Sequence, residues 1–314
     1  MGDSNLKRIY TAAAVLVLTL TGSAVAQPYQ SMFPGRADFS DEAKQYLERL
    51  DFKQGAVPLA GANATLNIPA DFYYLDPEDT KTVIVDIWGN PAGAADGVLG
   101  MIFPAKYAPT EVEAWGSLVE YSDDGYISDL DAATTDYDEL LQTLKQSVAE
   151  SNIEREKQGF SPITLVGWAS APRYDQSAHA LHWARDLIFG NEQGASHTLN
   201  YSVRLLGREG VVQYNFVADL AQLEEIKAAI PAVIKLVQFD KGKSYDDYQQ
   251  GDKLAAYGLA GVIAAGAGAK VAAKVGLLAL ALAFLKKGGF LIVLLVGGAL
   301  RFFSGLFGKK TPGA

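Results

Sequence analysis

The side chains best suited to chemistry are concentrated in one acidic run and in three histidines. The acidic run lies between residues 120 and 139 and comprises Glu120, Asp123, Asp124, Asp129, Asp131, Asp136, Asp138 and Glu139. Hard cations such as calcium need several oxygen ligands close together, so this run is a candidate metal site. Asp129 and Asp131 have the alternating spacing of a calcium loop, but no glycine occupies its turn position and no glutamate closes it. The pattern favours a solvated acidic loop, with Asp129 and Asp131 as its metal candidates.

A zinc site or a histidine general base would have to use His179, His182 or His197, because the chain has no other histidine. On a strand, the side chains of His179 and His182 would point to opposite faces, whereas on a helix they would lie together. A loop is expected just before them, over residues 172–175. We expect packing and hydrogen-bonding roles for these histidines.

The alternative is a periplasmic hydrolase or metal-binding enzyme in which Asp129, Asp131 and His182 act together. Clustering of these three side chains in one concave pocket would favour the enzyme, and their dispersal would favour a binding protein. Serine nucleophile signatures are missing, since no G-x-S-x-G elbow surrounds Ser170, Ser177 or Ser196. The chain also has no cysteine, which excludes thiolate metal sites and cysteine nucleophiles. We therefore predict no cofactor, and favour a protein that is not an enzyme.

The charge is divided unevenly along the chain. The net charge is −9; residues from Lys253 onward carry eight basic side chains and no acid, and residues 1–26 carry a net +1, which leaves −18 for the segment between. Such a segment repels phosphate backbones, so we expect no nucleic acid partner.

Both ends of the chain indicate export and membrane attachment. Lys7 and Arg8 precede an apolar run, and small residues at 24 and 26 then suit a signal peptidase, so residues 1–26 are expected to be a signal peptide. Residues 253–287 are rich in Ala and Gly and predict an interfacial or membrane helix. Residues 288–308 predict a transmembrane helix, and residues 309–314 form a short basic tail. The apolar centre of the expected span is Phe290, Leu291, Ile292, Val293, Leu294, Leu295 and Val296.

The Ala/Gly-rich segment leaves the number of membrane crossings open. Lys270 and Lys274 make an unassisted crossing expensive, so a single span and a two-helix hairpin are both compatible with the sequence. Small residues recur every fourth position on the opposite face and could let another helix approach closely; they are Ala260, Ala264, Gly268, Ala272 and Gly276. A structural, oligomer-forming membrane protein is therefore a further alternative.

The segment over residues 27–252 has the pattern of an acidic α+β domain, with largely antiparallel strands covered by helices and followed by the helical membrane-associated tail. Short apolar runs between Gly, Pro and Asn predict strands over residues 64–68, 72–75, 98–103 and 115–121. Helices are expected over residues 41–50 and from a cap at Thr135 to about residue 157.

The clearest local pattern is a hairpin over residues 198–217, in which apolar and polar residues alternate on both strands. Gly207 and Gly210 in its loop are expected to supply a positive φ or a tight bend. Asp219 and Gln222 then have the spacing of a capping box, and an amphipathic helix follows.

Several strings in this order resemble the family named domain of unknown function 2167, described as bacterial predicted membrane-anchored proteins. They are WGNPAGAADGVLGMIFPA from Trp88, DDGYISDLDA from Asp123, VGWASAPRYD from Val166, LHWARDL from Leu181, LNYSVRLLGREGV from Leu199 and GDKLAAYGLAGVIAAG from Gly251. The resemblance implies an exported domain with membrane helix at its C-terminus, and it brings no catalytic residues. We expect an inner-membrane protein whose periplasmic domain binds another envelope component, most simply a protein or a second copy of itself.

Overall fold

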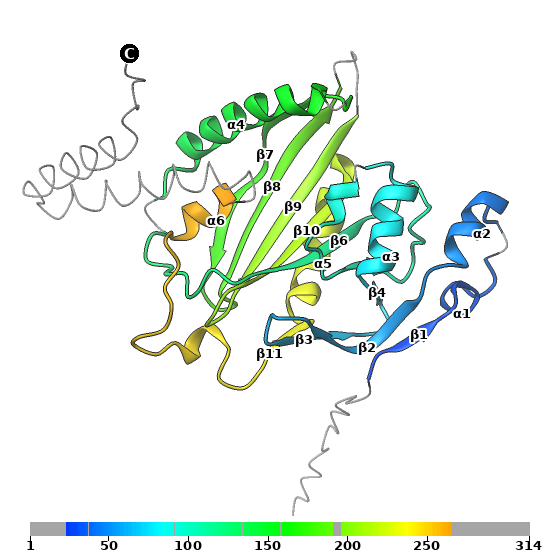
Figure 1. Ribbon diagram of the computed structural model, residues 1–314, viewed down its shortest axis with the longest axis horizontal. Helices are drawn as coiled ribbons and strands as arrows, with labels where there is room; N and C mark the ends of the chain where they lie inside the picture. The colour runs from blue at the N-terminus through cyan, green and yellow to red at the C-terminus, as the bar shows by residue number, and fades with distance from the viewer. Residues whose placement is uncertain are drawn as a thin grey trace, which may run out of the picture.

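The computed structural model describes residues 23–265 except 37, 91, 133–134, 158 and 191–195. Its strands form one antiparallel sheet in the order β11-β3-β2-β4-β5-β6-β10-β9-β8-β7, and β1 pairs with β2 (Figure 1). The strands are β1 Val25–Gln27, β2 Phe52–Leu59, β3 Ala64–Ile68, β4 Phe72–Leu75, β5 Gly100–Pro104, β6 Gly116–Ser122, β7 Ile163–Asp175, β8 Ala180–Phe189, β9 His197–Leu206, β10 Val211–Asp219 and β11 Val237–Phe239. The α-helices are α1 Tyr29–Met32, α2 Asp41–Leu47, α3 Pro77–Lys81, α4 Tyr137–Lys157, α5 Leu223–Ile234 and α6 Leu259–Ala265. The expected α+β class is confirmed for this part of the chain.

The β9–β10 hairpin follows the sequence pattern closely. Alternate residues of the two strands, beginning with Leu199 and Val212, are buried on one face of the sheet. Asp219 and Gln222 form the expected capping box at the start of the helical segment that leads into α5. The apolar side of α5 packs against that face through Ile226, Ile230 and Val233.

The glycines of the hairpin loop are needed for space rather than for an unusual backbone angle. Neither Gly207 nor Gly210 has a positive φ, so that part of the expectation is wrong. A Cβ atom at Gly210 would lie 2.2 Å from the Ser122 carbonyl oxygen, and one at Gly207 would lie 2.7 Å from the Phe239 ring. Any larger residue would therefore have to displace a neighbour.

The other face of the long strands is covered by α4 and α6 (Figure 1). Leu181 and Trp183 of β8 pack there in one buried cluster with Leu144 of α4 and Ile263 of α6. The strands β7 to β10 thus lie between two helical layers, with α5 on one side and α4 and α6 on the other.

Helix α4 has a different cap from the one expected. Asp136, rather than Thr135, accepts hydrogen bonds from the backbone N–H groups of Asp138 and Glu139, both at 3.0 Å. Aspartate is a strong N-cap residue because its carboxylate satisfies N–H groups that have no partner within the helix.

Strand β7 includes residues 172–175, which the sequence pattern predicts as a loop. The pairing of β7 with β8 shifts register between Leu165 and Gly167 and twice more before Arg173. These irregularities interrupt the period-2 alternation of apolar residues, so the sequence pattern does not predict a strand here.

A third cluster covers the N-terminal half of the sheet. It lies beneath α1, α2 and the helical residues 82–87 that follow α3, against β2, β4 and β5. It is rich in aromatic rings that meet mostly edge to face. Its largest rings are Phe33, Phe39, Phe52, Tyr73 and Phe103.

The globular part extends past the boundary expected at residue 252. Leu259 and Ile263 of α6 are fully buried, and Ala260 and Ala264, two members of the small-residue ridge, are buried as well. At the other end, the expected cleavage point after Ala26 falls within β1. Residues 1–22 and 266–314, with the span candidates Phe290 to Val296, lie outside the described residues. Among the described helices, none combines the length and apolar character that a membrane crossing requires.

Candidate binding site

The two aspartates predicted from the acidic run have structural partners on the α4 and α6 side of the sheet. Asp131 accepts hydrogen bonds from the backbone N–H groups of Leu259 and Ala260 at 3.1 and 3.4 Å, which places a negative charge at the N-terminus of α6. The Asp129 carboxylate accepts a hydrogen bond from the Tyr174 hydroxyl at 2.9 Å. Both carboxylates hold separate segments of the chain together.

His182 lies on the opposite face of the sheet. It alternates along β8 with Leu181 and Trp183 of the α4 side, and it shares its face with Ala180 and Ala184, which pack toward α5. The structure therefore does not bring Asp129, Asp131 and His182 together. Across the described ranges, no group of three or more acidic or histidine side chains is placed to hold a metal ion.

The other two histidines have hydrogen-bonding roles, as expected. His179 lies in the β7–β8 turn, where its Nε2 is 3.2 Å from Asp246 Oδ1 and its Nδ1 is 3.3 Å from the Tyr174 hydroxyl. His197 Nδ1 lies 2.7 Å from Asp186 Oδ1.

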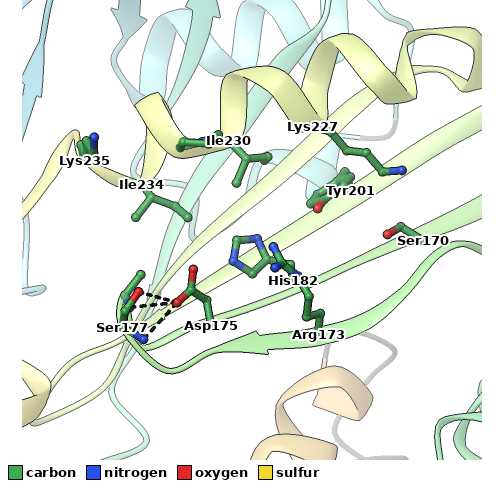
Figure 2. Close-up of a pocket in the computed structure, with 12 residues that line it drawn as sticks. Ser170, Arg173, Asp175, Ser177, His182, Tyr201, Lys227, Ile230, Ile234 and Lys235 are labelled. Carbon is green, nitrogen blue, oxygen red and sulfur yellow. Dashed lines mark hydrogen bonds between the residues drawn. The ribbon is translucent and has the colours of Figure 1, made fainter.

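His182 borders a cavity of about 540 Å³ between α5 and the strands β7, β8 and β9 (Figure 2). Ligand sites commonly have volumes of about 300 to 1,000 Å³. The strands and the turn contribute Ser170, Arg173, Asp175, Ser177, Ala178, His182 and Tyr201, and α5 with the residue after it contributes Lys227, Ile230, Pro231, Ile234 and Lys235. In Figure 2, the side chains of the strands point toward α5, and Ile230 and Ile234 face them from the helix. We call this cavity the α5 pocket.

His182 is the most unusual group in the α5 pocket. Its side chain is buried, with 3% of the residue exposed, and neither ring nitrogen has a hydrogen-bond partner. Burial, assisted by the positive charge of Arg173, lowers the pKa of His182 to about 4, so the ring is neutral near pH 7. A buried polar group without a partner costs about 1 to 3 kcal/mol. Thr110, Trp183 and Tyr214 also bury an unpartnered polar atom, but none of them lines the pocket.

Arg173 and Tyr201 lie beside His182. Arg173 is the cross-strand neighbour of His182 in the β7–β8 register, and Tyr201 pairs with Ala184 one step along the same face. Tyr201 is 5% exposed, and its hydroxyl makes no hydrogen bond with another described residue. Burial raises the pKa of Tyr201, so its hydroxyl remains protonated. The pocket therefore contains two neutral donors and a guanidinium side by side.

The single carboxylate of the lining is occupied locally. Asp175 Oδ1 accepts hydrogen bonds from the Ser177 N–H at 3.0 Å, the Ser177 hydroxyl at 2.7 Å and the Ala178 N–H at 3.3 Å (Figure 2). The hydrogen bonds from Ser177 lead the effects that lower the pKa of Asp175, which is thus ionised. Asp175 shapes the β7–β8 turn and marks the acidic end of the pocket.

This arrangement lacks the contacts of a hydrolase. A serine nucleophile needs a hydrogen-bonded base, and that base needs an orienting group of its own. His182 forms no hydrogen bond with Ser170, Ser177 or Asp175. The geometry suits the binding of a group that brings hydrogen-bonding atoms with it.

Sequence reasoning named His182 but not its companions. The sequence pattern predicts a loop at Arg173, which lies on β7, and Lys227 lies on a helix far along the chain. The available signal was that Arg173 and His182 fall in two of the strings that resemble a family, VGWASAPRYD and LHWARDL.

Comparison with known proteins agrees with that resemblance. The model of the family described as "Protein of unknown function (DUF2167)" matches residues 51–297. The chain belongs to this family. The matched region contains the whole α5 pocket and extends beyond α6. None of the curated proteins matches the chain.

Three solved structures share a distant similarity with the chain. The solution structure of the cyanobacterial PsbP protein CyanoP from Synechocystis sp. PCC 6803 is 11% identical, with a TM-score of 0.33, and the match covers 59% of this chain and 91% of that one. The Saccharomyces cerevisiae Ran-binding protein Mog1p is 11% identical, with a TM-score of 0.29, over 63% of this chain and 100% of its own. A variant of protein Mog1 is 11% identical, with a TM-score of 0.28, over 59% and 94%.

Proposed function

We propose that this protein is a binding module of the bacterial envelope, held at the inner membrane by its C-terminal segment, and that the α5 pocket is its ligand site. The observation that carries the proposal is His182, a buried imidazole with two unpartnered nitrogens at the wall of a cavity. An occupant that forms a hydrogen bond with the ring would reduce the free-energy cost of this burial.

Binding is favoured over catalysis by the positions of the candidate catalytic groups. Asp129 and Asp131 hold Tyr174 and α6 on the face opposite His182. A hydrolase built from the three would need them in one concave site.

The membrane attachment rests on the sequence pattern at the two ends. Residues 1–26 have the features of an export signal, and residues 288–308 have the length and hydropathy of a span, followed by Lys309 and Lys310. Helix α6, which packs in the buried core, is the last described element that precedes that segment in the sequence. In this proposal the domain lies in the periplasm, close to the membrane surface.

Photo-crosslinking in cells tests whether the pocket is occupied. The crosslinker p-benzoylphenylalanine would replace Lys235, which is exposed at the rim of the pocket, and in a control it would replace Arg49, which is exposed after α2. We expect an adduct from position 235 alone, detected by mass spectrometry of the purified full chain. The variant Ser170→Trp, which places an indole over the cavity, should abolish the adduct, whereas Gln142→Trp on an exposed part of α4 should leave it. Equal labelling at positions 235 and 49 would contradict the proposal.

A further inference from the structure

We infer that the α5 pocket takes an anionic head group attached to an apolar chain, with the head group at Arg173, His182 and Tyr201 and the chain along α5. The inference rests on the proposed function and names the chemistry of its ligand. A carboxylate, a sulfonate or a phosphate would each serve as the head group, since all present acceptor oxygens and a negative charge.

Arg173 differs from the other arginines in the described part of the chain. Each of those has a hydrogen-bond, ion-pair or ring partner: Arg36, Arg49, Arg155, Arg185, Arg204 and Arg208. Arg173 has none, although acidic residues far outnumber basic ones in this part of the chain. A guanidinium presents a planar fork of donors that matches the oxygens of a carboxylate or phosphate.

Further positive charge comes from α5. Lys227 and Lys235 both line the pocket, and Lys227 is partly neutralised by Glu224, whose carboxylate lies 2.8 Å from its Nζ atom. Asp175 is the single acidic residue of the lining. The balance of charge in the pocket is thus opposite to that of the domain around it, and it favours a ligand anion over a cation.

The two neutral hydrogen-bond donors, His182 and Tyr201, also favour an anionic ligand. A neutral His182 has one N–H, and Tyr201 has one O–H, and both lack an acceptor. An oxyanion has only acceptors and can receive both hydrogen bonds while it pairs with Arg173. A cationic head group would leave both donors without a partner and would meet the charge of Arg173.

The apolar residues on the α5 side of the pocket favour a ligand that carries an apolar chain. Ile230, Pro231 and Ile234 form an apolar wall that a bare ion would leave in contact with water. Burial of apolar surface contributes roughly 25 cal/mol per Å², so even a short chain adds to affinity. The ionised Asp175 at the turn repels an anion, which directs the head group toward Arg173.

Three matched six-carbon probes separate the possible ligand classes. Hexane-1-sulfonate is an anion at every working pH, hexan-1-ol is its neutral analogue, and hexyltrimethylammonium is its cationic one. The full-length chain, kept in a non-ionic detergent, would be titrated with each by calorimetry while the imidazole signals of its three histidines are followed by NMR. We expect the sulfonate to bind most tightly and to shift the signals of His182, with those of His179 and His197 unchanged.

Arg173→Gln provides the decisive variant, because this exposed side chain supports no other residue. It should weaken binding of hexane-1-sulfonate by about tenfold or more, the loss expected for a charge-assisted hydrogen bond, and Arg49→Gln should not. Equal affinity for the sulfonate and the alcohol, or an unchanged affinity in Arg173→Gln, would overturn the anionic class while leaving the pocket as a ligand site. If no probe shifts the His182 signals, the proposed function fails as well.

The same titration identifies the source of the anion. Dihexanoylphosphatidylglycerol carries a lipid head group, whereas hexane-1-sulfonate represents a free organic acid. Tighter binding of the lipid would support an anionic membrane lipid as the ligand, and tighter binding of the sulfonate would support a soluble acid.

Discussion

The two faces of the long strands use their polar side chains in different ways. On the α4 and α6 face, Asp131 caps α6, and Arg204, although buried, donates to Asn215 and to backbone carbonyls and lies over the Trp183 ring. On the α5 face, His182 and Arg173 lie at a cavity without a partner. Charged groups with partners explain how the domain holds together, whereas unpartnered polar groups that cluster at a cavity indicate where something else binds.

Removal of α6 should destabilise the domain most, because it uncovers the face of the sheet that α4 and α6 cover. A chain that ends at Gln250 loses the buried residues Leu259, Val262 and Ile263, each worth about 1.5 to 3 kcal/mol. We expect a loss of roughly 5 kcal/mol or more, comparable to the whole stability of a typical domain. Urea denaturation of the truncated chain, compared with one that ends at Ala265, measures the effect. Equal denaturation midpoints would show that α6 is not part of the core.

A change in pH should act on the α5 face through the protonation of His182. The pKa of His182 is lowered from 6.5 to about 4 in the folded chain, so between these values the unfolded chain binds more protons and stability falls as pH falls. The full effect is about 3 kcal/mol, since each pKa unit corresponds to about 1.4 kcal/mol. The groups that face the ring from its surroundings are Arg173 and Asp175 of β7, Tyr201 of β9, and Lys227 and Lys235 on the α5 side.

The free energy of unfolding of the wild type and of His182→Phe, measured from pH 7 to pH 4, isolates this contribution, because other titrating groups cancel in the difference. We expect the wild type to lose stability relative to the variant as pH falls through this window. Parallel curves would mean that His182 does not titrate with a lowered pKa.

The cap of α6 should have a smaller effect. Asp131→Ala leaves two backbone N–H groups without an acceptor and removes a charge from the helix N-terminus, so we expect a loss of about 1 to 2 kcal/mol. Asp131→Asn keeps an acceptor oxygen and should recover most of that loss. Neither variant should alter ligand binding in the α5 pocket, and a change there would show that the two faces are coupled.

The sequence predicted the elements whose pattern is regular. The β9–β10 hairpin and α5 were found because alternation and helical periodicity run through them without a break, and the capping box marks where the helical segment begins. The sequence pattern does not predict strand β7 and suggests a loop at its end, because register shifts disturb its alternation before Arg173. The start of the Ala/Gly-rich segment was assigned outside the domain because its composition resembles the tail, yet α6 is buried in the core.

The residues of the α5 pocket were harder to predict from the sequence than these helices and strands. A dense acidic run drew attention to Asp129 and Asp131, but Asp131 bonds to Leu259, which is 128 residues away, and that contact depends on the tertiary fold. The α5 pocket likewise joins residues of β7, β8 and β9 to residues of α5. That a buried histidine has no partner is a property of its surroundings, which no spacing of residue types reveals.

Whether His182 serves a ligand rather than the fold is tested by the free energy of unfolding of His182→Phe at pH 7, together with photo-crosslinking of this variant from position 235. Phenylalanine keeps the shape of the buried ring and removes two polar atoms that lack partners, so we expect stability that is equal or higher by about 1 kcal/mol. Because the ring nitrogens are assigned to ligand binding, the adduct should be lost in the same variant. A loss of several kcal/mol with the adduct retained would contradict the assignment of His182 to ligand binding, since the side chain would then serve the fold.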